Sequence, residues 1–416
     1  MYTDYRLNDE NLIDYQKYEQ IILTISKRFM TYGYTRIQTP MFEQYDLYTK
    51  VTSSIHQNEM MKVIDGTGQV LVLRPDVTIP ITRQLAAGIS ELRNEYRYFY
   101  VQDVFRQTFD GQGNSQRTQA GVEYFGVSSP EADAEVIALS CQTVTDLGLQ
   151  DCKIEIGHAG FFNELISEMN LTATQVKMLT KMIQAKNVTE IESFILDLPI
   201  GEKVKKAIMM IPFLYGKPEE VQYRAAEIAF TPNLKNKLEH LAKVVELLKL
   251  YGLEDYLVLD LGLINHMGYY SGIIFQGFVE HIGKPVLMGG RYDQLGNEFE
   301  AEIPAIGFAC EIDSLIEASA NRLVESPIQL DAKIIYDSAC ISQSIQLANE
   351  LRDQNYRVLS LPSQKKVFNH QQSTCTIYLE EASHSLLYQE KKTPFVNSSE
   401  VVRLLEEERG TYNCVL

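Results

Sequence analysis

Five short segments of this sequence place polar side chains within stretches that otherwise look like β-strands. These side chains bring carboxylate, guanidinium, amide, hydroxyl and phenol groups, which can donate hydrogen bonds to a bound molecule or accept them. Strand alternation puts Gln119, Gly121 and Glu123 on one face. A single charged residue on a half-exposed strand is usually solvated, but the five segments together, in this order, indicate a functional site. The segments are Arg74–Thr78, Phe105-Arg106, Gln119–Glu123, Tyr269-Tyr270 and Gly289–Asp293.

Several common catalytic signatures are absent from the sequence. It contains no GxxxxGK[ST] phosphate loop, no GxGxxG after a strand, no HExxH and no GxSxG. The pair Gly111 and Gly113 lies in a polar loop without a following helix, which favours a flexible turn. His158 and His266 each stand alone, which favours structural histidines. The sequence therefore gives no sign of a nucleotide loop, a metalloprotease or a serine hydrolase.

The composition indicates a globular chain with more than one domain. At 416 residues, with 45% hydrophobic and 22% charged, the chain can form two or three domains. Its 38 basic and 55 acidic residues give 38 − 55 = −17, which disfavours loose binding to nucleic acid or anionic lipid. Six cysteines without CxxC spacing favour idle thiols over a zinc site. Without a membrane-length apolar stretch or a secretory signal, we expect a cytoplasmic protein.

The first part of the chain predicts a helix followed by long hairpins. Apolar residues at helical spacing predict a helix over residues 11–30, and Gly33 suits the position just after its end. Asp65-Gly66-Thr67-Gly68 predicts a hairpin turn. Because few helices separate the expected strands, we predict an antiparallel sheet. These strands are residues 36–40, 62–64, 69–73, 96–105 and 121–126.

The rest of the chain predicts a helical insertion and a second domain. Helix formers dominate from about residue 161, with an apolar stripe along Leu234–Leu250. Strand patterns then resume at residues 257–259, 273–275 and 285–288. Ser326-Pro327 is typical of a linker, and a β-α-β-β pattern follows it. The expected domains are a body of residues 1–160 and 251–325, an all-helical insertion of residues 161–250, and a small α/β domain of residues 328–416.

The polar segments follow the order of five motifs of the histidyl-tRNA synthetase family, which the sequence resembles over essentially its whole length. The resemblance implies an α+β fold: a class II synthetase-like antiparallel sheet flanked by helices, followed by a reduced anticodon-binding domain. The residues that carry it are Tyr34–Glu43 for the dimer-forming first motif, Phe105–Gly126 for the second, Tyr269–Gly272 and Gly289–Asp293 for the histidine-specific motifs, and Pro304–Ala309 for the third.

The half of that family's site that binds ATP is not retained here. Ser314 stands where the third motif has an arginine, and Glu311 stands where it has a close-packing glycine. Asn265 replaces a further arginine, Thr108 an acidic residue, and Arg117 the aromatic residue that covers adenine. Losing one charge-stabilising arginine typically costs about 3 kcal/mol in the transition state. The resemblance therefore implies a protein that does not form an adenylate.

The half that binds the amino acid is retained. Carboxylates near an ammonium group and near an imidazolium nitrogen are chemically suited to free histidine. One residue is shorter than in the family, because Asp76 stands where the family has a glutamate. The positions that match the family's histidine pocket are Asp76, Thr78, Arg106, Gln119, Glu123, Tyr269 and Tyr270.

This combination resembles the regulatory subunit of ATP phosphoribosyltransferase, as does Ile156-Gly157-His158 before the helical insertion. The resemblance implies a non-catalytic protein, without cofactor or metal, that forms dimers. It implies assembly with a short-form catalytic subunit for the first step of L-histidine biosynthesis, and feedback by L-histidine. Two alternatives stay open: an active histidyl-tRNA synthetase, and a synthetase-derived sensor of tRNA or amino acids.

Overall fold

The chain forms two compact units. The computed structural model describes residues 9–50, 57–88, 95–107, 115–196, 198–264, 269–319, 330–363, 373–388, 391–397 and 399–405. One unit is Lys17–Leu323, and the other is Val324–Leu416 grouped with Met1–Gln16. The expected linker Ser326-Pro327 lies outside the described residues. Over these ranges, no helix is both long enough and apolar enough to cross a membrane.

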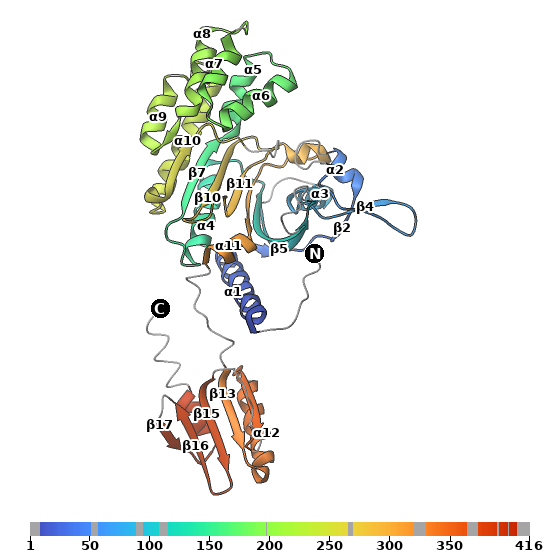
Figure 1. The fold of residues 1–416 in the computed structure, drawn as a ribbon, viewed down its shortest axis with the longest axis vertical. Helices are drawn as coiled ribbons and strands as arrows, with labels where there is room; N and C mark the ends of the chain where they lie inside the picture. Colours follow the sequence, from blue (N-terminus) through green and yellow to red (C-terminus); the bar gives the residue numbers. More distant parts are fainter. Residues whose placement is uncertain are drawn as a thin grey trace. The chain divides into compact units, whose positions relative to one another are not determined.

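A mixed sheet forms the centre of the larger unit (Figure 1). Its strands are β1 (Thr35–Arg36), β5 (Tyr96–Phe105), β6 (Gln116–Phe125), β7 (Lys153–His158), β8 (Tyr215–Gly216), β9 (Leu257–Asp260), β10 (Ile273–Phe278), β11 (Leu287–Arg291) and β12 (Ala305–Glu311). Their order is β1-β5-β6-β12-β11-β10-β7-β9-β8. The predicted antiparallel pairing is confirmed through the middle of the sheet. The parallel pairs β1–β5 and β7–β9 were not predicted.

Two long helices pack on this sheet, α1 (Asp9–Thr31) and α4 (Pro130–Thr145). The predicted first helix is confirmed: Ile21, Ile25 and Phe29 are fully buried in the main core. Gly33 follows the helix with φ +79°, a left-handed conformation that favours glycine. A third helix, α11 (Ile312–Ser319), follows β12 directly.

A small sheet and two short helices stand beside β5. The predicted hairpin is confirmed as β3 (Lys62–Ile64) and β4 (Val70–Leu73), and β2 (Phe42–Gln44) pairs with β4 on its other side. Of the strand expected over residues 36–40, only Arg36 lies in a strand, at the end of β1, and the next strand, β2, begins at Phe42. The helices are α2 (Tyr45–Lys50) and α3 (Thr78–Gly88), and the latter's Ile79, Ile81 and Leu85 join a second core.

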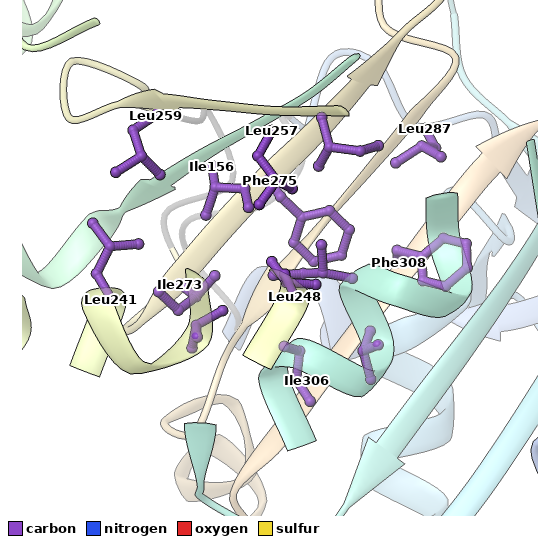
Figure 2. Close-up of a cluster of buried hydrophobic side chains, with 14 of the residues drawn as sticks. Ile156, Leu241, Leu248, Leu257, Leu259, Ile273, Phe275, Leu287, Ile306 and Phe308 are labelled. Carbon is purple, nitrogen blue, oxygen red and sulfur yellow. The ribbon is translucent and has the colours of Figure 1, made fainter. Parts of the chain in front are cut away.

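The segment between β7 and β9 is helical apart from the two-residue strand β8, which pairs with β9 and was not predicted. Its helices are α5 (Ala159–Ser167), α6 (Ala173–Gln184), α7 (Val188–Leu196), α8 (Glu202–Met210), α9 (Pro218–Ala226) and α10 (Pro232–Leu250). The apolar stripe of α10 shares the main core with the sheet. Figure 2 shows this cluster, with Leu241 and Leu248 of α10 together with Phe275 of β10.

The smaller unit is a five-stranded sheet with one long helix against it. The predicted β-α-β-β pattern is present as β13 (Leu330–Tyr336), α12 (Ile341–Asp353), β14 (Val358–Pro362) and β15 (Ser373–Glu380). Two further strands, β16 (Ser383–Tyr388) and β17 (Lys391–Pro394), were not predicted. The strand order is β14-β13-β15-β16-β17.

Candidate functional site

One cavity of about 260 Å³ in the larger unit brings together every residue predicted for the site. The strand face that carries Gln119 and Glu123 belongs to β6. Thr78 begins α3, and Arg106 follows the end of β5. The lining residues that were predicted are Asp76, Thr78, Arg106, Gln119, Glu123, Tyr269 and Tyr270.

Glu123 lies at the buried end of the cavity, with 2% of its surface exposed. The Thr78 hydroxyl donates to its Oε1 at 2.5 Å, and the Tyr292 hydroxyl donates to its Oε2. The pKa of Glu123 is raised to about 8, mainly by burial and also by the nearby Asp76, while the hydrogen bonds from the two hydroxyls oppose the shift. This shift favours the protonated carboxyl of Glu123 at neutral pH, whereas a cationic donor would favour the carboxylate.

Asp76 is buried beside Glu123 and also supports the local backbone. Its Oδ1 accepts the Ile79 N–H at 2.8 Å, in the first turn of α3. Burial raises the pKa of Asp76, while the Ile79 N–H and the Arg106 guanidinium act against the shift. The Arg106 Nε donates to the carbonyl of Pro75 at 2.9 Å, which fixes that side chain at the cavity wall.

A group of tyrosines encloses the buried end. The ring centroids of Tyr269 and Tyr270 are 4.9 Å apart, and those of Tyr269 and Tyr292 are 5.7 Å apart. Tyr100 of β5 lies opposite Gly121 in the β5–β6 register. Tyr100 and Tyr292 were not among the predicted site residues. The sequence held a signal for Tyr292, because it lies in the polar segment Gly289–Asp293.

Glycines on the neighbouring strands make room for these side chains. A Cβ at Gly121 would come within 2.5 Å of the Tyr100 hydroxyl and 2.7 Å of the Phe308 carbonyl oxygen. A Cβ at Gly307 would collide with the Glu123 carboxylate and the Val122 carbonyl. The close backbone approach at both positions is what allows Glu123 and Tyr100 to fill the end of the cavity.

The opposite end of the cavity, its mouth, carries charged side chains that the prediction did not include as binding residues. Arg117 and Glu311 form an ion pair with an N–O distance of 3.2 Å, and Lys284 lines the wall nearby. The Ser314 hydroxyl donates to the other Glu311 oxygen at 3.4 Å. Glu311 therefore contacts two other departures from the synthetase pattern, Arg117 and Ser314, although 194 residues separate Arg117 from Glu311. Asn265 and Thr108 lie outside the described residues.

Other polar residues of the predicted segments serve the structure instead. Arg291 donates to the fully buried Asp133 at 2.8 Å, and the His240 ring of α10 lies 2.6 Å from the second Asp133 oxygen. Arg74 donates to backbone carbonyls of Thr39, Pro40 and Asp103. These contacts join α10, α4 and β11, and they join the segment before β2 to β5.

The remaining candidate for chemistry, His158, is also buried. Burial lowers its pKa to about 3, and the neighbouring His240 and Lys237 add to the effect. His158 is therefore neutral in the folded protein, in keeping with a structural histidine. His266 lies outside the described residues. Within the described ranges, no three His, Cys, Asp or Glu side chains are grouped as a metal site requires.

The sheet, its helices and the cavity define a class II synthetase-like protein. A family model described as histidyl-tRNA synthetase matches residues 7–315. A solved structure described as an ATP phosphoribosyltransferase regulatory subunit/histidyl-tRNA synthetase from Bacillus halodurans is 28% identical, with a TM-score of 0.76 over 88% of this chain and 94% of that one. Histidyl-tRNA synthetase from Nostoc shares the fold, with 16% identity and a TM-score of 0.76 over 95% and 96% of the two chains.

Two relatives narrow the family. The ATP phosphoribosyltransferase regulatory subunit of Oceanobacillus iheyensis is 46% identical over 352 residues, which are 84% of this chain and 86% of that protein. The protein of the same name from Ruminiclostridium cellulolyticum is 32% identical over 362 residues, 86% of each chain. The chain therefore belongs to the ATP phosphoribosyltransferase regulatory subunit family, which confirms the resemblance found from the motifs.

Proposed function

We propose that this chain is a non-catalytic regulatory subunit of ATP phosphoribosyltransferase. In this proposal it senses L-histidine in the cavity that is lined by Gln119 and Glu123 of β6. One observation carries the proposal: residues as far apart in the sequence as Asp76 and Glu311 line a single cavity whose buried end is acidic and hydrogen-bonded. The family membership supports the regulatory role in histidine biosynthesis.

The dimensions and charge of the cavity favour an amino acid over a nucleotide. At about 260 Å³ the cavity is smaller than the roughly 300–1,000 Å³ of pockets for drug-sized ligands. Glu311 places an anion at the mouth, where it opposes the phosphates of ATP. The Arg117–Glu311 pair also occupies space at that end. These features support a protein that does not form an adenylate.

The buried end suits the side chain and ammonium group of histidine. Glu123 accepts hydrogen bonds on both oxygens and can receive an imidazole N–H in addition. Asp76 keeps one oxygen for the α3 backbone and offers the other to an ammonium group. Tyr270 and Gln119 add polar contacts on the two sides of such a ligand.

Regulation then requires a partner, because this chain has no phosphoribosyl-transfer site in our proposal. We infer that the partner is a short-form catalytic subunit, and that the chain itself dimerises through Tyr34–Glu43. Coupling between two binding sites is commonly about 1–3 kcal/mol and is reciprocal. Binding of the catalytic subunit should therefore change this chain's affinity for histidine by a certain factor. Histidine should change the chain's affinity for the catalytic subunit by the same factor.

The direct test mixes the purified full chain with the short-form catalytic subunit of the same organism. Sedimentation velocity should show a heavier species than either protein alone, and formation of phosphoribosyl-ATP should rise well above that of the catalytic subunit. L-Histidine should inhibit the mixture. Separate sedimentation with unchanged activity would contradict the assignment, as would histidine-dependent ATP–pyrophosphate exchange by the chain alone.

A further inference from the structure

We propose that Arg117 binds the α-carboxylate of an amino acid in the cavity, and that it leaves its ion pair with Glu311 to do so. This inference rests on the proposed function, because it assumes an amino acid in the cavity. It assigns a binding role to a residue that differs from the synthetase pattern.

The two ends of the cavity match the two ends of an amino acid. The buried end is acidic, with Asp76 and Glu123. Two basic groups, Arg117 and Lys284, line the wall at the mouth, whereas Arg106 acts electrostatically on Asp76. A zwitterionic ligand needs both, and guanidinium groups bind a carboxylate bidentately where an ammonium group cannot.

The spacing along β6 places Arg117 at the opposite end of the strand face from Glu123. Alternation puts Arg117, Gln119, Gly121 and Glu123 on one strand face, about 6.6 Å apart for each two residues. In our proposal the side chain of histidine lies at Glu123 and its carboxylate lies along β6 near Gln119, one repeat from Arg117. The nearby Arg106 already donates through Nε to the Pro75 carbonyl.

The ion pair between Arg117 and Glu311 is easily exchanged. A single nitrogen contacts Glu311 at 3.2 Å, and the two side chains are 42% and 29% exposed. Ion pairs this accessible to water contribute little net free energy, because solvent and salt screen them. The Arg291–Asp133 pair is a contrast within the same unit, since its side chains are 4% and 0% exposed.

Glu311 keeps other favourable contacts when Arg117 moves away. Its other oxygen already accepts the Ser314 hydroxyl at 3.4 Å, and it directly precedes α11, whose N-terminal end favours an anion. Exchange of Arg117 therefore breaks a side-chain link between β6 and β12 without leaving Glu311 unpaired. The mouth of the cavity then has two arrangements: Arg117 paired with Glu311, or Arg117 paired with the ligand's carboxylate.

The experiment is a calorimetric titration of the full chain with L-histidine and with L-histidinol, which has a hydroxymethyl group in place of the carboxylate. In Arg117→Met, the affinity for histidine should fall about tenfold to a hundredfold, as expected when a charged hydrogen-bond partner is lost. The affinity for histidinol should change less than about twofold, since no carboxylate is present. Arg28→Met, which removes an exposed ion pair with Asp146 far along the chain, is the matched control and should change neither.

Glu311→Gln removes the competitor and should tighten histidine binding about twofold to fivefold, the range expected for an exposed ion pair. The gain should disappear in Arg117→Met/Glu311→Gln. Equal weakening of both ligands in Arg117→Met, or unchanged histidine binding, would overturn the carboxylate role while leaving the proposed function standing. If the wild-type chain binds neither ligand, the proposed sensing site fails together with this inference. The same holds if Glu123→Gln binds each ligand as tightly as the wild type does.

Discussion

The two ends of the cavity hold carboxylates in opposite environments. Glu123 is 2% exposed, receives two hydroxyl hydrogen bonds and has its pKa raised to about 8 by burial. Glu311 at the mouth is part of a partly exposed ion pair with Arg117. In our proposal this difference separates two tasks: the buried end selects the ligand, and the mouth exchanges ion-pair partners.

The largest expected effect concerns the buried ion pair that supports the acidic end. Arg291→Met leaves the buried Asp133 without its arginine, and loss of one partner of a buried pair typically costs about 3–5 kcal/mol of unfolding free energy. Arg291 also precedes Tyr292, which donates to Glu123. Guanidinium denaturation measures the change.

Arg117→Met is the control for that variant, because its ion pair is much more accessible to water than the Arg291–Asp133 pair. It should cost no more than about 1 kcal/mol. Equal losses in the two variants would mean that the buried end and the mouth do not differ as the exposures indicate.

The next effect comes from the glycine behind Glu123. Gly307→Ala introduces a Cβ that collides with the Glu123 carboxylate and with backbone, so we expect a loss of about 1–3 kcal/mol in stability, with impaired ligand binding. Gly66→Ala meets open space in the β3–β4 turn and should leave binding unchanged. Thermal unfolding with and without ligand compares the two. Unimpaired binding in Gly307→Ala would show that the close packing at this end is not required.

A smaller effect is the pH dependence that Glu123 adds to stability. Its folded-state pKa of about 8 lies above the ordinary value of 4.5, so folding favours the protonated form. The resulting stabilisation is present below pH 4.5 and is lost as the pH rises to about 8. Glu123→Gln should remove this loss, so denaturant midpoints at pH 5 and pH 8 should lie closer together than in the wild type. Parallel curves for the two proteins would contradict the assignment of the proton to Glu123.

Local pattern was enough to predict the parts of the fold set by neighbours in the chain. The helix before Gly33 and the hairpin around Asp65–Gly68 follow from spacing and turn residues, and β5 has the predicted bounds. Strand direction was not predictable at the edges, because alternation is the same in parallel and antiparallel pairs. Strand β16 was missed since its polar residues, Ser383–Ser385, do not form an apolar stripe.

The candidate site divides in the same way. The residues that line its buried end could be predicted from motif order, including Glu123 and Thr78. The hydrogen bond from Tyr292 to Glu123 joins positions 169 residues apart, and the Arg117–Glu311 pair spans 194. Such pairings depend on the register of strands across the sheet, which the sequence of either strand alone does not contain.

The most direct test of the account is calorimetric titration of L-histidine into the wild-type chain and into Glu123→Gln at pH 8, where the carboxylate is substantially ionised. The account predicts saturable binding by the wild type, weakened about tenfold or more in the variant, because a buried charged hydrogen-bond partner is lost. Equal affinity in the two proteins would contradict the claim that histidine is sensed at the buried end of this cavity.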